Sequence, residues 1–207
     1  MKSKSYIGIS FIILIFGIYA VPRIIDKLNG NDLVVIESAP KFALTDQNHK
    51  MISNATYKGK VYVLEFFFST CPSICPIMNR NMIGIQNEFF GNPNFGIASI
   101  TINPENDTPE VLAAHAKKLG VTGINWHFLT GDKKYIYDIA SKFKIFAGEN
   151  SKVEGGFEHS GLFALIDKKG NIRCRKDEKG NPIMYYDGLE KKGVNAIKED
   201  IKLLLEE

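Results

Sequence analysis

Residues 61–76 read VYVLEFFFSTCPSICP, and this segment sets the expected architecture of the chain. Its first eight residues are almost all β-branched or aromatic, which is typical of a strand buried on both faces. Gly59 precedes this strand, and an adequate helical pattern runs from Pro76 to Phe90. The segment therefore predicts a strand that leads directly into a helix, with Cys71 and Cys75 at the junction.

Strand and helix patterns continue on either side of this segment. A short hairpin is expected from residues 39–44 and 50–52, and a second buried strand from residues 96–102. Asp107 is expected to cap a helix that ends at Gly120. The later elements expected are a strand at 126–129, a helix from Asp132 to about 143, a hairpin from 162–166 and 171–175, and a helix at 194–205. This order predicts an α/β fold, a central mixed β-sheet with helices on both faces.

The composition is that of one ordinary globular domain. The chain has 207 residues, 44% of them hydrophobic and 24% charged, and its three cysteines are too few for a disulfide-rich secreted fold. The formal net charge of +3 comes entirely from residues 1–30, so the rest of the chain is neutral overall. A neutral body gives no charge-based reason to expect a nucleic-acid partner.

The N-terminus carries a targeting pattern. Two lysines precede an uncharged apolar stretch from Tyr6 to Val21, which is intermediate in length between a signal-peptide core and a membrane-spanning helix. We predict that residues 1–22 form an uncleaved membrane anchor; a cleaved signal peptide and a buried core helix are the alternatives. Residues 23–38 are then a tether and residues 39–207 the folded domain. The positive flank predicts a single-pass protein of the cytoplasmic (inner) membrane, with its C-terminal domain on the extracytoplasmic, periplasmic side.

Cys71 and Cys75 are the candidate site residues at the strand-to-helix junction. Ligands of α/β sheets gather at the carboxyl ends of strands, and a helix N-terminus stabilises a thiolate. The four-residue spacing predicts that both sulfurs lie on the same side of one helical turn. A Cys-x-x-x-Cys pair alone does not choose between a redox dithiol and a metal site, and simple burial is a third interpretation.

Two thiolates leave a metal ion under-coordinated, and His159 is the candidate for a third ligand. It follows a glycine-rich loop and immediately precedes the expected strand at 162–166. The other histidines, His49, His115 and His127, lie in a polar turn, a helix and a strand, where a structural role is the simpler interpretation. A solvated loop histidine is the alternative for His159.

These motifs resemble those of the SCO/SenC family of membrane-tethered copper proteins with a thioredoxin-like fold. The resemblance covers about residues 39–205, and it is carried by FFFSTCPSICP at 66–76, NPENDTP at 103–109 and EHS at 158–160. A Thr-Cys-Pro-x-x-Cys-Pro element with a later histidine is far more specific than a bare cysteine pair. The resemblance implies a thioredoxin-like fold for the body of the chain.

The resemblance also implies a copper site formed by Cys71, Cys75 and His159. Two soft thiolates and one imidazole suit Cu(I), whereas a structural zinc site normally takes four ligands; the sequence leaves open whether Cu(II) is held as well. The implied partner is the copper-accepting subunit of a respiratory oxidase or another copper protein. Delivery of copper to the dinuclear centre of cytochrome c oxidase, or reduction of that centre's cysteines, is the implied role. Asn103 stands where family members commonly carry Asp, which puts any role of that carboxylate in doubt.

The sequence therefore predicts a membrane-tethered copper metallochaperone, with enzymatic activity left open. The alternative is an extracytoplasmic thiol-disulfide oxidoreductase, in which Cys71 attacks a target and Cys75 resolves the mixed disulfide. A weaker alternative is a copper- or redox-responsive sensor that signals through a membrane partner.

Four other residues near these motifs are given structural interpretations. Met78 and Met82 follow the cysteine pair at helical spacing, which is typical of core packing. Cys174 is expected to be a buried or free cysteine in a hairpin strand, and Glu158 an exposed loop acid.

Overall fold

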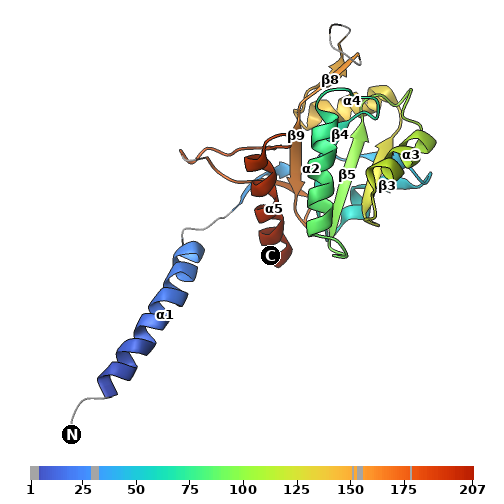
Figure 1. Cartoon of the computed structure of the whole chain (residues 1–207). Coiled ribbons are helices and arrows are strands. Elements are labelled where there is room, and N and C mark those ends of the chain that lie inside the picture. Colours follow the sequence, from blue (N-terminus) through green and yellow to red (C-terminus); the bar gives the residue numbers. More distant parts are fainter. Residues whose placement is uncertain (1–4, 29–32, 151, 153–155, 178) are drawn as a thin grey trace. The chain divides into compact units, whose positions relative to one another are not determined.

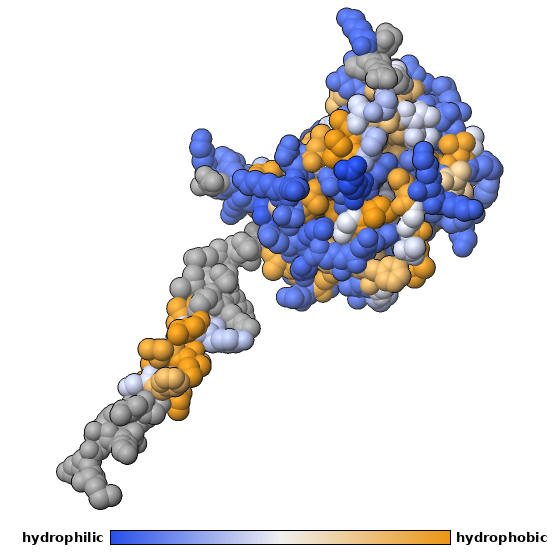
Figure 2. Space-filling view, viewed as in Figure 1, coloured by the Kyte–Doolittle hydropathy of each residue, from blue (hydrophilic) through white to orange (hydrophobic). Residues whose placement is uncertain are grey.

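The computed structural model describes residues 5–28, 33–150, 152, 156–177 and 179–207. The chain forms two compact units, Met1–Leu33 and Val34–Glu207. The first contains the helix α1 (Ser5–Leu28), whose described side chains include a series of exposed apolar residues between Phe11 and Val21 (Figure 2). No helix within the described residues is both long and apolar enough to cross a membrane. The anchor expected at residues 1–22 stays a prediction.

The segment expected to be a tether contains regular structure at both ends. Helix α1 continues past Pro22 to Leu28, and strand β1 (Val34–Ser38) pairs antiparallel with β10 (Asn171–Cys174). The folded unit therefore begins at Val34 rather than at residue 39. A short, half-exposed strand at the edge of a sheet has a weak sequence pattern, because its partner strand lies far away along the chain.

One mixed sheet forms the centre of the second unit (Figure 1). Its strands follow the order β1-β10-β9-β4-β5-β6-β2-β3, and β11 also pairs with β9. The central strands β4, β5 and β6 are parallel, and the other pairs are antiparallel. The remaining bounds are β2 Ala43–Asp46, β3 Met51–Ser53, β4 Val61–Phe67, β5 Phe95–Thr101, β6 Trp126–Thr130, β9 Leu162–Ile166 and β11 Tyr186–Asp187. The two predicted hairpins are confirmed as β2–β3 and β9–β10.

Helices cover both faces of this sheet, as predicted. Helix α2 (Cys75–Glu88) joins β4 to β5 and contacts α5 (Lys191–Glu206). Helix α3 (Pro109–Leu119) joins β5 to β6, and α4 (Lys133–Lys142) follows β6. Neighbouring residues of a strand point to opposite faces. Phe67 of β4 stacks on His115 of α3, whereas Phe66 contacts Phe143, directly after α4. Helices α3 and α4 therefore lie on opposite faces.

The core lies around the two central strands. Every residue of β4 and β5 is buried, as their apolar runs predicted. A short helix, η1 (Asn54–Tyr57), adds the buried ring of Tyr57, which stacks on Tyr62 of β4. The sequence did not predict η1 or a separate small hairpin formed by β7 (Ala147–Glu149) and β8 (Phe157–His159). This hairpin ends at the candidate ligand His159.

Candidate metal centre

The two cysteines lie at the carboxyl end of β4, in the connection to α2. Cys75 is the first residue of α2, and Cys71 lies in the preceding loop. The backbone N–H of Cys71 donates to the carbonyl of Phe68, and the Cys71 sulfur accepts from the backbone N–H of Cys75 at 3.5 Å. The two sulfurs lie close together, as predicted, but not on one helical turn, because Cys71 precedes the helix and its loop folds back onto the helix N-terminus.

His159 reaches this pair from β8, 84 residues after Cys75 in the sequence. Its Nε2 lies 3.0 Å from the Sγ of Cys75, and its Nδ1 lies 3.2 Å from the carbonyl oxygen of Ser160. A carbonyl only accepts, so this contact favours a proton on Nδ1 and leaves the lone pair of Nε2 facing the sulfur. The ring also packs edge-on against Phe68 at 5.8 Å between centroids. These contacts fix the orientation of the imidazole.

The structure brings all three candidate ligands together. The two sulfurs and a ring nitrogen of His159 lie within 4.8 Å of one another, and all three residues are buried. Among the described residues, this is the one group of three or more His, Cys, Asp or Glu side chains with such a spacing. Two soft sulfurs and one nitrogen are a donor set for a soft, low-coordinate ion such as Cu(I).

The two thiols have opposite electrostatic environments. The Cys75 thiol donates to the Cys71 sulfur, and this bond, with further hydrogen bonds from the backbone N–H groups of Cys75 and Ser73, lowers the pKa of Cys71 against the effect of burial. The same bond and burial raise the pKa of Cys75. Cys71 is therefore the thiolate of the pair, and Cys75 keeps its proton until a metal ion or a base removes it.

A buried carboxylate, that of Asp107, holds the cysteine loop against the sheet. Asp107 accepts from the backbone N–H and the hydroxyl of Ser69, from the hydroxyl of Thr101 and from the side-chain amide of Asn106. The predicted capping role of Asp107 is wrong: Thr108 is the N-cap of α3 and accepts from the N–H of Val111. Sequence alone did not separate these roles, because Asp and Thr are both good caps and stand side by side.

Asn103 has a main-chain role in the same turn. Its carbonyl accepts from the N–H groups of Asn106 and Asp107, and its own N–H donates to Thr101. These bonds do not depend on whether residue 103 is Asn or Asp. The turn that presents Asp107 is therefore compatible with either residue.

A second buried acid, Glu65, lies on β4 below the cysteine loop. Its Oε1 accepts from Ser99 at 2.7 Å, and its Oε2 has no partner among the described residues. Burial raises the pKa of Glu65 to about 7, against the opposing effects of the Ser99 hydroxyl and His159. The Glu65 charge in turn helps to raise the pKa of Cys75. Glu65 was not among the residues predicted to form the site, although a lone acid in an apolar strand was the available signal.

The other histidines do not belong to this group of ligands and have structural settings. His49 is exposed and lies 3.1 Å from Glu110. His127 pairs with the buried Asp46 at 3.0 Å. His115 packs between the rings of Phe67 and Phe128.

The remaining sequence candidates have the structural settings expected of them. Met78 and Met82 are buried in the core, and Cys174 is a buried free cysteine in β10. Glu158 is exposed and accepts from the side chain of Asn150. The carbonyl of Ser160, rather than Glu158, therefore orients the His159 ring.

Hollows open on both sides of Cys71. One, of about 460 Å³, lies between α2 and α3 and is lined by both cysteines. The other, of about 340 Å³, is lined by Cys71, His159 and apolar side chains that include Phe68 and Phe157. The site is buried but can be approached from two directions.

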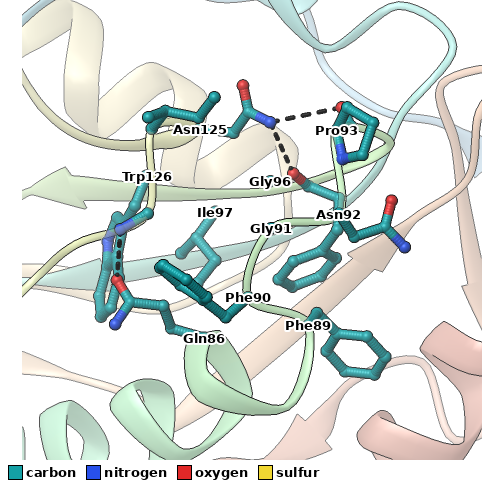
Figure 3. A pocket seen from close by; sticks show the side chains of 13 residues that line it. Gln86, Phe89, Phe90, Gly91, Asn92, Pro93, Gly96, Ile97, Asn125 and Trp126 are labelled. Carbon is teal, nitrogen blue, oxygen red and sulfur yellow. Dashed lines mark hydrogen bonds between the residues drawn. The ribbon is translucent and has the colours of Figure 1, made fainter.

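Another hollow lies around the loop that follows α2, away from the cysteines (Figure 3). Its lining consists of aromatic, aliphatic, amide, proline and glycine residues. The side-chain amide of Asn125 spans it by donating to the carbonyls of Pro93 and Phe95. These contacts tie the start of β5 to the start of β6, which is a structural role.

Comparison with known proteins gives consistent matches. The SCO1/SenC family model matches residues 35–192. The SCO1 protein homolog of Bacillus subtilis (strain 168) is 31% identical over 165 residues, which cover 78% of this chain and 79% of the homolog.

Two solved structures share the fold. One is BsSco, a member of the Sco family of cytochrome c oxidase assembly proteins in which a disulfide switch was identified. It matches with a TM-score of 0.68 and 29% identity, over 83% of this chain and 94% of its own. The other is yeast Sco1 with copper bound, with a TM-score of 0.61, 24% identity and coverage of 81% of this chain and 90% of its own.

Proposed function

The chain belongs to the SCO1/SenC family, and from this membership we propose that it is a copper metallochaperone. In this proposal Cys71, Cys75 and His159 bind Cu(I), and the protein passes it to the copper-accepting subunit of a respiratory cytochrome c oxidase. The observation that carries the proposal is the convergence of two sulfurs and one imidazole nitrogen within 4.8 Å of one another. Two similar structures support the proposal: yeast Sco1 has copper bound, and BsSco is a member of a family of cytochrome c oxidase assembly proteins.

The chemistry of the site suits a protein that gives its metal away. Three ligands hold Cu(I) without closing its coordination shell, so a donor from a partner can add before one of the three leaves. The hollows on both sides of Cys71 leave room for that approach. Phe68 and the Ser160 carbonyl keep the His159 ring in place while the ligands exchange.

We also propose that residues 1–22 tether the protein to the cytoplasmic membrane, with the folded unit on the extracytoplasmic side. The support is the pair of N-terminal lysines before the apolar stretch at residues 6–21. A membrane-impermeant maleimide added to intact, reduced cells should then label Cys71. Labelling only after lysis would contradict this placement.

Anaerobic titration of the reduced full-length chain with Cu(I), in competition with a chelator, tests the copper site. We expect one tightly held copper ion per chain, loss of that binding in Cys71→Ser and Cys75→Ser, and binding weakened by at least about tenfold in His159→Ala. His49→Ala is the matched control, because His49 is an exposed histidine away from the sulfurs. Unchanged affinity in His159→Ala would remove His159 from the site, and weak, non-stoichiometric binding by the unaltered chain would contradict the proposal.

The lowered pKa of Cys71 favours a second candidate function, reduction of a partner disulfide. The Cys71 thiolate would attack one sulfur of the target disulfide and release the other as a thiolate. Cys75 would then lose its proton and attack the Cys71 sulfur, which forms the Cys71–Cys75 disulfide and frees the second target thiol. In a single turnover without metal, Cys75→Ser should trap the mixed disulfide. Failure of the reduced, metal-free chain to reduce any cysteine-pair peptide would count against this function.

A further inference from the structure

The hollow between α2 and α3 has an unusual lining. It is about 460 Å³ in volume and has Cys71 and Cys75 at one end. Asn79 and Arg80 of α2 line it from one side, and His115 and Lys118 of α3 line it from the other. The lining therefore combines the metal-binding sulfurs with amide, imidazole and cationic groups.

Two polar atoms of this lining are buried without a partner. Asn79 is only 7% exposed, and its Oδ1 makes no hydrogen bond within the described part of the protein. The Nε2 of His115 is also buried and unpaired there. Burial lowers the pKa of His115, so its ring is neutral at pH 7 and carries no charge of its own into the hollow. Buried polar atoms are rarely left unsatisfied in native proteins, so these atoms point to a polar ligand.

Two cations lie at the rim of this hollow. Arg80 and Lys118 are exposed, and neither takes part in any ion pair among the described residues. By contrast, Lys198 and Lys202 of α5 both pair with Glu88 of α2. The hollow therefore presents two free positive charges close to the cysteine pair.

The hollow on the other side of Cys71 differs in character. Its lining is mainly apolar and includes Phe68, Ile74 and Phe157, with Glu158 as its acidic member. An anionic ligand would be repelled by Glu158 there and attracted by Arg80 and Lys118 on the α2–α3 side. The charges thus distinguish the two approaches to the same sulfur.

We propose that the α2–α3 hollow binds an acidic, cysteine-bearing peptide segment of the protein that exchanges copper with this site. A carboxylate of that segment pairs with Arg80 and Lys118, a backbone N–H donates to Oδ1 of Asn79, and the segment's cysteine sulfur lies beside Cys71. The proposal rests on the copper-transfer function above, and it adds the side of approach and the charge of the partner.

Peptide binding to the reduced, metal-free full-length chain tests this proposal without any sulfur chemistry. The probe is the acetylated, amidated peptide Gly-Asp-Ser-Glu-Gly, in which serine replaces the cysteine, and its neutral counterpart carries Asn and Gln instead of Asp and Glu. In an NMR titration, we expect the acidic peptide to bind and the neutral peptide to bind at least about tenfold more weakly. Binding of the acidic peptide should weaken as salt is raised.

Variants locate the binding to the hollow. The double variant Arg80→Gln/Lys118→Gln should lose at least about tenfold in affinity for the acidic peptide. Lys117→Gln is the control on α3, because it removes one positive charge next to Lys118 at a residue that does not line the hollow. Asn79→Ala should lower the affinity for both peptides, since it removes an uncharged hydrogen-bond acceptor.

Three results would overturn the proposal: no binding of the acidic peptide at millimolar concentration, equal binding of the two peptides, or equal losses in Lys117→Gln and the double variant. Copper titration of the unaltered chain, beside its peptide titration, separates this proposal from the one on which it rests. If the chain binds one copper ion but shows no charge-selective peptide binding, only the proposal about the hollow is contradicted. If the chain binds the acidic peptide selectively but does not bind copper, the metallochaperone function is contradicted and the hollow remains an acidic-peptide site.

Discussion

Cys71 and Cys75 are the same residue type four positions apart, yet their neighbours give them different chemistry. Cys71 lies before the helix and receives hydrogen bonds, which stabilise its thiolate. Cys75 is more deeply buried and donates to Cys71, and this bond together with burial favours its protonated form. Metal binding must therefore remove one proton from the pair, and that proton comes from Cys75.

This asymmetry predicts how the thiols titrate in the reduced, metal-free protein. Thiolate absorbance at 240 nm should show one thiolate at pH values well below the ordinary thiol pKa of about 8.5. Cys71→Ser should abolish this low-pH thiolate. Cys75→Ala should move its titration to higher pH, because the donating thiol is gone. A single transition near the ordinary value in the unaltered protein would contradict the assignment.

Glu65 predicts a pH dependence of folding stability. Its pKa is about 7 in the folded protein and about 4.3 in an unfolded chain. Because the pKa is higher in the folded state, the contribution of Glu65 to the free energy of unfolding is fully present below about pH 4. That contribution is lost as the pH rises through about 7. Glu65→Gln keeps an acceptor for Ser99 and removes the charge. It should therefore stabilise the protein at pH 8 by about 1–3 kcal/mol, and much less at pH 5, in urea unfolding. Glu206→Gln, at an exposed glutamate of α5, should change neither value.

At the scale of elements, the loop from Phe68 to Ile74 is positioned by its neighbours rather than by its own sequence. The end of β4 places it at the sheet edge, and Asp107, from the turn after β5, binds it through Ser69. The same carboxylate binds Thr101 at the end of β5. One buried side chain thus connects two strand ends and the start of α3.

Removal of that carboxylate should therefore weaken both the fold and the site. Asp107→Ala leaves the Ser69 and Thr101 donors without their acceptor, and we expect a loss of about 2–4 kcal/mol in the free energy of unfolding. Copper affinity should fall as well, because the cysteine loop is no longer held. Asp132→Ala is the control, since Asp132 caps α4 in the ordinary way. It should cost about 1 kcal/mol and leave copper binding unchanged. Equal effects of the two variants on copper binding would contradict a positioning role for Asp107.

Elements with strong local patterns were predictable from the sequence. The fully buried strands β4 and β5 and the hairpin β9–β10 lie within a few residues of their expected bounds. The expected cap of α4 at Asp132 and the end of α3 at Gly120, with a left-handed φ of 75°, are also confirmed. Each of these features depends on side chains close together in the sequence.

Elements that depend on distant partners were not predictable. Strand β1 exists because β10 offers an edge, and β8 because β7 pairs with it. The role of Asp107 was missed because its partners Ser69 and Thr101 belong to other elements. His159 was singled out by its place in a motif and by resemblance, since no spacing along the chain shows that it lies near Cys75.

At the scale of the whole molecule, the site joins two distant parts of one chain. The cysteines lie in the connection from β4 to α2, and His159 comes 84 residues after Cys75, on the separate β7–β8 hairpin. An ion bound to all three ligands cross-links these parts. Because an unfolded chain does not hold the three ligands together, metal binding should favour the folded state.

Copper should therefore stabilise the reduced protein by an amount set by its affinity. With free Cu(I) buffered at about 1,000 times its dissociation constant, the free energy of unfolding should rise by about 4 kcal/mol. His159→Ala should show a smaller rise at the same free Cu(I), because the link to the β7–β8 hairpin is lost. Urea unfolding with a Cu(I) buffer measures both values. An equal rise in the variant would mean that the hairpin does not share in metal binding.

Cys174 allows that stabilisation to be assigned to the site rather than to thiols in general. It is a fully buried free cysteine in β10, and burial raises its pKa, so it is protonated and held within the folded unit. Cys174→Ala removes one sulfur from the sheet and should cost about 1 kcal/mol without copper. The rise produced by copper should nevertheless be the same as in the unaltered chain, and one copper ion per chain should remain. A smaller rise in Cys174→Ala would show that copper also reaches the interior of the sheet, and the three-ligand description of the site would then be incomplete.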